Sequence, residues 1–123
     1  MLMERKDLHK YGNAMAYKYR WLSQALEDMA HEIEYVRNEF GLSAARQAES
    51  KVHEGVQQLC QFPYSGVCYE EDVLFKGQEV RVLHLRQISV IYCIEDEMIT
   101  LIAIWNNYQN PNRLVNIIKT REE

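Results

Sequence analysis

The sequence has few of the residues that interrupt or cross-link a chain. Its 123 residues include only two prolines, five glycines and three cysteines. So little proline and glycine, together with 47% hydrophobic residues, excludes a low-complexity or disordered protein. The length suits one globular domain, which can bury a hydrophobic core without support from disulfides or metal.

The cysteines and the lack of long apolar runs indicate in which cellular compartment the protein is found. Cys60, Cys68 and Cys93 form no C-x-x-C pair, and their odd number leaves at least one thiol unpaired within the chain. Such a pattern favours a reducing environment. No apolar stretch approaches the roughly 20 residues that cross a bilayer, and residues 1–12 lack the apolar core of a signal peptide. We therefore expect a cytoplasmic protein without membrane contact.

Motifs of the common enzyme classes are also missing. The sequence contains no phosphate-binding loop, no dinucleotide-binding glycine motif and no G-x-S-x-G nucleophile. His9, His31 and His53 stand without a cysteine or carboxylate at ligand spacing, so we expect no metal and no cofactor. The net charge of −4 and the pI near 5.6 lower the expectation of nucleic-acid binding, which usually requires concentrated positive charge.

The first part of the chain contains an extension and then a strand. Residues 1–14 are polar and lack a clear period; residues 4–10 would fit a short helix, or the natural start could be Met15. From Met15 to Leu22 aromatic and polar residues alternate, which predicts a strand. We expect a single domain over residues 15–123.

Apolar residues then recur every three or four positions and predict two helices. Ser23 suits the N-cap of the first helix, which runs to Phe40 and stops at Gly41. The second helix opens at Ser43 and ends before Pro63. The short connection makes them antiparallel neighbours. The residues expected to face inward are Leu26, Met29, Ala30, Ile33, Val36 and Phe40, followed by Ala45, Ala48, Val52, Val56, Leu59 and Cys60.

The remaining elements form a meander of strands. They are, in order, a loop over residues 64–76, strands over 78–86, 89–95 and 98–105, and a short helix from Pro111 with Asn110 as its N-cap. Asp96 and Glu97 form the turn between the last two strands. Because these two strands are apolar at nearly every position, they are either buried on both faces or have one face that a partner protein covers.

In this order, the chain resembles the RelE/ParE family, the toxins of bacterial type II toxin–antitoxin modules. The likeness covers residues 15 to 114 and rests on the helix end "LCQFP", on Gly66, on Arg81 in "VRVLHL" and on Tyr92 in "VIYCIEDE". It implies an α+β fold, β-α-α-β-β-β, in which a helical hairpin packs on one face of a small twisted antiparallel sheet. The N-terminal strand would pair with the meander. The resemblance also implies a cognate antitoxin that wraps and neutralises the toxin in an oligomeric complex.

The family has two kinds of target. RelE-like members cut messenger RNA in the ribosome, whereas ParE-like members act on DNA gyrase and are not nucleases. The nucleases carry an arginine where this chain has Ser89, and basic residues where it has Asn106, Asn107 and Tyr108. Cleavage needs cations to stabilise the charge that develops on the phosphate. We therefore predict a ParE-like protein that binds its target rather than an enzyme.

The expected target-binding residues are Arg81, Arg86, Tyr108 and Arg113. Arg81 would also fit a structural role, tethering carbonyls or the acidic run 70–72 of the preceding loop. Two alternatives remain open. One is a ribosome-dependent messenger-RNA endoribonuclease in which His84 and Tyr108 replace the missing cations, although a solvated edge position is the simpler interpretation of His84. The other is an interaction module of the same fold without toxicity.

Trp105, at the end of the last strand, has two interpretations of its own. It is either a core residue or a contact for the antitoxin, since aromatic side chains are favoured at protein interfaces.

Overall fold

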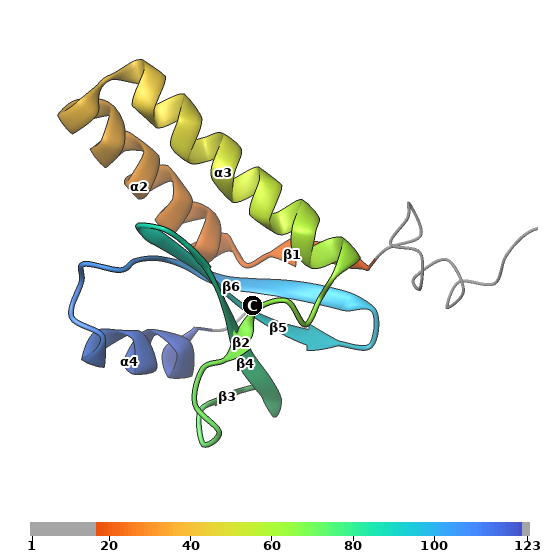
Figure 1. Ribbon diagram of the computed structural model, residues 1–123. Helices are drawn as coiled ribbons and strands as arrows, with labels where there is room; N and C mark the ends of the chain where they lie inside the picture. Colours follow the sequence, from red (N-terminus) through yellow and green to blue (C-terminus); the bar gives the residue numbers. More distant parts are fainter. Residues whose placement is uncertain (1–16, 122–123) are drawn as a thin grey trace, which may run out of the picture.

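The α+β class is confirmed by the computed structural model, which describes residues 17–121 (Figure 1). The predicted extension at 1–14 and the start of the first strand at Met15 lie outside the described residues. The elements are β1 (Lys18–Trp21), α2 (Ser23–Phe40), α3 (Leu42–Gln61), β2 (Val67–Cys68), β3 (Leu74–Phe75), β4 (Gln78–Leu85), β5 (Ile88–Glu95), β6 (Met98–Asn106) and α4 (Asn112–Thr120). Within this part of the chain no helix is long and apolar enough to cross a membrane.

The sheet has the strand order β1-β6-β5-β4-β2, with β3 also paired to β4. The predicted meander β4-β5-β6 is antiparallel. The first strand differs, because β1 lies at the edge and runs parallel to β6, with Lys18 opposite Met98 and Trp21 opposite Leu101. β2 and β3 fall inside the segment predicted as a loop; each has only two residues, too few to show a period in the sequence.

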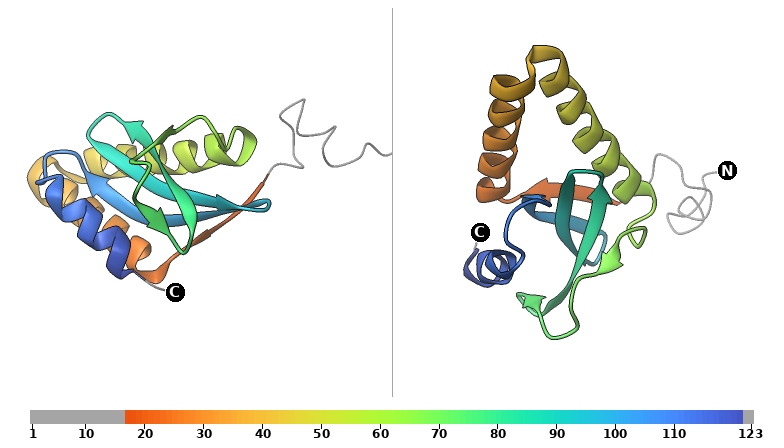
Figure 2. Two further views of the ribbon diagram at one scale, coloured as in Figure 1. Left: turned by 90° about the horizontal axis from the view of Figure 1, so that it is seen from below. Right: turned by 60° about the vertical axis from the view of Figure 1, so that its left-hand side comes forward.

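Both faces of the sheet are covered. The α2–α3 hairpin and α4 lie on opposite sides of it (Figures 1 and 2). On the hairpin side, Leu59 of α3 packs with Tyr92 and Leu101. On the other side, Leu114 of α4 packs with Ile91 and other sheet residues. The nearly continuous apolar runs of β5 and β6 are therefore explained by burial on both faces.

The ends and inner faces of the two long helices differ in part from prediction. Ser23 is not the N-cap: α2 begins with it, after Leu22, and no side chain caps the helix. Gly41, at φ +95°, ends α2 as predicted, but it also directly precedes α3, which starts one residue before Ser43. The inward positions of α3 are confirmed; all are buried except the half-buried Ala48.

In α2 several residues that were predicted to face inward are exposed, toward both ends of the helix. Leu26 is 51% exposed and Phe40 is 68% exposed, and Ala30 is exposed as well, whereas Ala25 and Met29 are buried. The far tip of the hairpin projects beyond the sheet (Figure 1), and Phe40 is the last residue of α2 at this tip. An amphipathic period does not tell how far a helix extends past its neighbours.

A β-bulge in β6 is stabilised by an ion pair between the helices. The register passes from Ile91–Ala103 to Tyr92–Leu101, so Ile102 has no residue opposite it in β5. Its carbonyl accepts a 2.8 Å hydrogen bond from Nη1 of Arg121, which follows α4. The guanidinium of Arg121 also donates to both carboxylate oxygens of Asp28 in α2, at 2.5 and 2.8 Å.

The Asp28 carboxylate in turn binds β6 directly, because one of its oxygens accepts the backbone N–H of Ile104 at 3.1 Å. β1 pairs with β6 only as far as Leu101. Beyond the end of β1, the side chains of Asp28 and Arg121 thus form the hydrogen bonds that the backbone groups of β6 would otherwise lack. This pair was not predicted from the sequence, in which its members lie 93 residues apart.

Replacing Arg121 by glutamine should lower the free energy of unfolding by about 2–3 kcal/mol, because the mostly buried Asp28 carboxylate loses its counter-ion and the Ile102 carbonyl loses its donor. Urea unfolding measures this. Arg113→Gln, at an exposed position of α4, is the control and should change stability by less than about 0.5 kcal/mol. Equal stabilities of the two variants would contradict the role given to Arg121.

Candidate functional site

The structure brings most of the predicted site residues to one end of the sheet and leaves one apart. Where β4 turns into β5 and β6 ends, His84, Arg86, Ser89, Asn107 and Tyr108 come together; we call these five residues the polar sheet end. Arg113 follows in the first turn of α4. Arg81 lies on the same face of β4 as Leu83, which packs with the hairpin core, and does not join them.

A directional chain of hydrogen bonds orders the polar sheet end. Nδ2 of Asn107 donates to the Arg86 carbonyl at 3.0 Å, which fixes the amide so that its Oδ1 accepts. The Ser89 hydroxyl donates to that Oδ1 at 2.7 Å. Because the Ser89 hydroxyl proton is used in this bond, the Ser89 oxygen accepts from Nδ1–H of His84, 2.8 Å away. In the neutral form of the ring this leaves Nε2 as an acceptor. His84 is exposed, as expected, but it is also oriented, which the sequence did not predict.

An apolar cleft of about 520 Å³ begins at this chain of hydrogen bonds and runs along the α4 side of the sheet. Trp105 lies at its floor and is only 6% exposed, packed among core residues. Its interpretation as a core residue fits this burial; a contact with an antitoxin stays a prediction. The other residues lining the cleft are Val67, Cys68, Tyr69, Val82, His84, Ser89, Ile91, Asn107, Gln109, Pro111 and Leu114, without a lysine or arginine among them.

Arg81 is engaged in fixing the loop after α3. Its Nη2 donates to the carbonyls of Gly66 and Tyr64, at 2.6 and 3.3 Å, and its guanidinium lies 5.1 Å from the centre of the Tyr64 ring. Nη1 pairs with Glu79 at 2.6 Å. The structural interpretation therefore holds for the carbonyls, whereas the carboxylate that Arg81 binds is Glu79 and not one of residues 70–72.

Tyr92 completes the same structural unit. It is fully buried; its hydroxyl donates to the Pro63 carbonyl at 2.7 Å and accepts from the Gly66 N–H at 3.1 Å. A Cβ on Gly66 would lie 2.6 Å from both the Tyr92 hydroxyl oxygen and the Val82 carbonyl oxygen, so only glycine fits. Pro63, Gly66, Arg81 and Tyr92, which carried the family resemblance, thus form one hydrogen-bonded unit.

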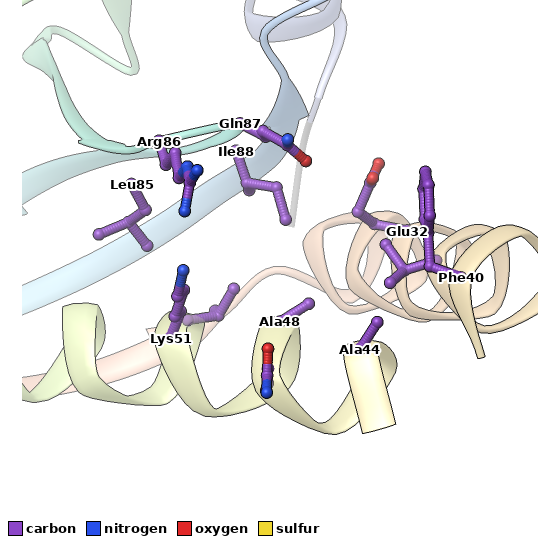
Figure 3. Close-up of a pocket in the computed structure, with 12 residues that line it drawn as sticks. Glu32, Phe40, Ala44, Ala48, Lys51, Leu85, Arg86, Gln87 and Ile88 are labelled. Atoms are coloured by element: carbon purple, nitrogen blue, oxygen red, sulfur yellow. The ribbon is translucent and has the colours of Figure 1, made fainter. Parts of the chain in front are cut away.

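A second hollow, of about 330 Å³, lies between the hairpin and the β4–β5 turn; we call it the hairpin groove (Figure 3). Its apolar lining is Val36, Phe40, Ala44, Ala48, Val52, Leu85 and Ile88, and its polar lining is Glu32, Gln47, Lys51, Arg86 and Gln87. Figure 3 shows the side chains of Lys51 and Arg86 pointing toward one another across it. Lys51 was not among the residues predicted from the sequence, where nothing distinguishes it from an ordinary helix surface charge.

The three thiols offer no ready nucleophile. Burial raises the pKa of Cys93 to about 11 and also raises the pKa of Cys60. Desolvation and then Glu79 raise the pKa of Cys68, so all three thiols stay protonated at neutral pH. Over residues 17–121, no group of three or more His, Cys, Asp or Glu side chains is placed to hold a metal ion.

The buried Tyr92 hydroxyl gives a stability test. Tyr92→Phe should lower the free energy of unfolding by about 1–3 kcal/mol, because it leaves the Gly66 N–H and the Pro63 carbonyl unpaired. Denaturant unfolding measures the loss. Tyr108→Phe removes the same hydroxyl at a 79% exposed position and should cost less than about 0.5 kcal/mol. A Tyr92→Phe protein as stable as this control would show that the hydroxyl does not hold the loop.

NMR can test the direction of the hydrogen-bond chain at His84, because it determines which ring nitrogen carries the proton. At a pH at which the His84 ring is neutral, imidazole ¹⁵N shifts should place its proton on Nδ1, and Ser89→Ala should remove this fixed tautomer. His53, exposed on α3, serves as the reference within the same protein and should not change. If His84 of the unsubstituted protein gives the same shifts as His53, the proposed direction of the chain is wrong.

Comparison with known proteins identifies the family. Residues 19–111 match the family model described as ParE toxin of type II toxin–antitoxin system, parDE. Among solved structures, a chain of the chromosomal ParDE TA system from P. aeruginosa superposes with a TM-score of 0.61 at 20% identity, over 74% of this chain and 96% of that chain. Curated protein sequences gave no match. The family model spans most of the chain, and the chain therefore belongs to the ParE toxin family of type II toxin–antitoxin systems.

Proposed function

We propose that this protein is the growth-inhibiting toxin of a ParDE-type module. It acts in the cytoplasm by binding an essential target of the DNA gyrase kind, and a cognate antitoxin neutralises it in an oligomeric complex. Membership of the ParE family supports the toxin class and implies the antitoxin. The observation that carries the choice of binding over RNA cleavage is the lining of the cleft, where the described residues include no lysine or arginine to neutralise a phosphate.

The target surface lies around the polar sheet end. Tyr108 is 79% exposed there, Arg113 is exposed on α4, and Arg86 is exposed on the β4–β5 turn, with its side chain toward the hairpin groove. Exposed tyrosine and arginine are the side chains that most often dominate a protein interface. Arg81 contributes by holding the loop after α3, since its guanidinium is already bound to protein groups.

The alternative is a ribosome-dependent endoribonuclease, and one observation favours it. The hydrogen-bond chain through Ser89 leaves Nε2 of His84 as an oriented acceptor, the arrangement required of a general base. The exposed Tyr108 belongs to the same sheet end. Primer extension on translated message decides: discrete cleavages that disappear in His84→Ala or Tyr108→Phe would replace the binding mechanism with this one.

Expression in the native host tests the proposed function. Induction without the antitoxin should arrest growth, and co-expression of the antitoxin should restore it. Tyr108→Ala should weaken the arrest, because it removes the most exposed aromatic side chain of the target surface. Tyr19→Ala, at a 43% exposed tyrosine on β1, opposite Ile99 and away from the polar sheet end, is the matched control and should arrest growth fully. Antitoxin binding without any growth effect would instead indicate a non-toxic interaction module.

A further inference from the structure

One row of apolar side chains forms part of the floor of the cleft on the α4 side. Val67 on β2, Val82 on β4 and Ile91 on β5 stand opposite one another in the sheet, and all three line the cleft. Val82 and Ile91 pack in one cluster with Leu114 of α4, so this row faces α4. Val67 is 57% exposed, so one end of the row is open to solvent.

A second row, two residues further along β4, carries polar groups. His84, Ser89 and Trp105 stand opposite one another on β4, β5 and β6. Because residues two apart in a strand project to the same face, this row also faces α4. The hydrogen-bond chain uses the Ser89 hydroxyl and Nδ1 of His84. In the neutral ring, Nε2 of His84 then remains an acceptor without a partner among residues 17–121.

The cleft is free of ionic side chains over the part of the chain that the structure describes. Its lining contains no lysine, arginine, aspartate or glutamate, although these residues make up 26% of the sequence. A charged group placed inside would lose its hydration without gaining a counter-ion. The volume of about 520 Å³ falls within the roughly 300–1,000 Å³ of typical ligand pockets. The cleft therefore suits an uncharged group.

The acceptor at His84 narrows the class of group further. An aliphatic side chain that covered Nε2 would leave this nitrogen without a hydrogen bond, which costs free energy. Tyrosine and tryptophan combine a large apolar ring with one O–H or N–H donor, and both are enriched among the dominant contacts of protein interfaces. Tyr69 and Trp105 line the cleft as well, so an aromatic ring would pack against aromatic neighbours.

We propose that the cleft receives one tyrosine or tryptophan side chain of the target protein, whose O–H or N–H donates to Nε2 of His84. The cleft adjoins the proposed target surface, because Asn107 and Gln109 line it and the exposed Tyr108 lies between them in the chain. This assignment rests on the proposed function, which supplies a protein target. It adds the place and the chemistry of one contact.

Binding of p-cresol, the tyrosine side chain as a free molecule, tests the cleft by itself. At a pH at which the His84 ring is neutral, p-cresol should bind with millimolar affinity and shift the NMR signals of His84 and Trp105, while Trp21, outside the cleft lining, stays unchanged. 4-Methylanisole, in which a methyl group replaces the hydroxyl proton, should bind at least about fivefold more weakly. If p-cresol shifts neither signal, or if phenyl phosphate binds more tightly than p-cresol, the assignment is wrong.

Val67→Asp tests whether the target uses the cleft, since it places a carboxylate in the apolar row at an exposed position. It should weaken both p-cresol binding and inhibition of gyrase supercoiling by at least about tenfold. Leu74→Asp makes the same change at a 50% exposed position of β3 outside the cleft lining and should alter neither. Circular dichroism checks that both variants are folded. The comparison of p-cresol with 4-methylanisole needs no variant, so it stays decisive if Val67→Asp does not fold.

The outcomes separate the cleft from the function. If p-cresol binds as expected but Val67→Asp inhibits gyrase as strongly as Leu74→Asp, the cleft takes a free aromatic molecule, and its assignment to the target is wrong. If p-cresol binds but the unsubstituted protein does not inhibit gyrase, the proposed function fails, and a side chain of this target is excluded as the occupant.

Discussion

The ion pair between Asp28 and Arg121 holds together three elements that are distant in sequence. β6 is buried on both faces, and its bulge at Ile102 leaves a carbonyl that no neighbouring strand can satisfy. Arg121 supplies the donor for that carbonyl, and Asp28 accepts the N–H of Ile104 beside it. A buried backbone group without a partner costs about 1–3 kcal/mol, so the two side chains permit the bulge and fix α2 and the end of α4 against the strand.

The polar sheet end lies beyond the bulge on the same strand. The bulge lies four residues before the end of β6, and the segment from Asn107 to Pro111 connects β6 to α4, after which Arg121 follows. The Asn107 amide reaches Arg86 and Ser89 across the start of β5. The result is an ordered surface with hydrogen-bonding groups and an exposed tyrosine, and the described residues that line its cleft include no lysine or arginine. This is the surface that we propose contacts the target.

Sequence reasoning succeeded where a pattern extended over many residues. The helical hairpin and the strands β4, β5 and β6 each show a period or a long apolar run with a clear stop, and residues such as Gly41 and Pro63 mark the ends. It failed for short or distant features: the two-residue strands β2 and β3, the exposed ends of α2, and the parallel pairing of β1. In the site, the sequence distinguishes Ser89 only as a position at which the nucleases carry an arginine. Its hydrogen bonds with His84 and Asn107 could not be predicted, because they exist only after the sheet has formed.

Inhibition of purified DNA gyrase tests most directly whether this protein acts by binding. In a supercoiling assay the refolded, antitoxin-free protein should reduce supercoiling in proportion to its concentration, Tyr108→Ala should be weaker, and translated message in a parallel reaction should stay intact. Unchanged supercoiling together with discrete ribosome-dependent cleavage of the message would contradict the binding mechanism and make His84 a catalytic residue.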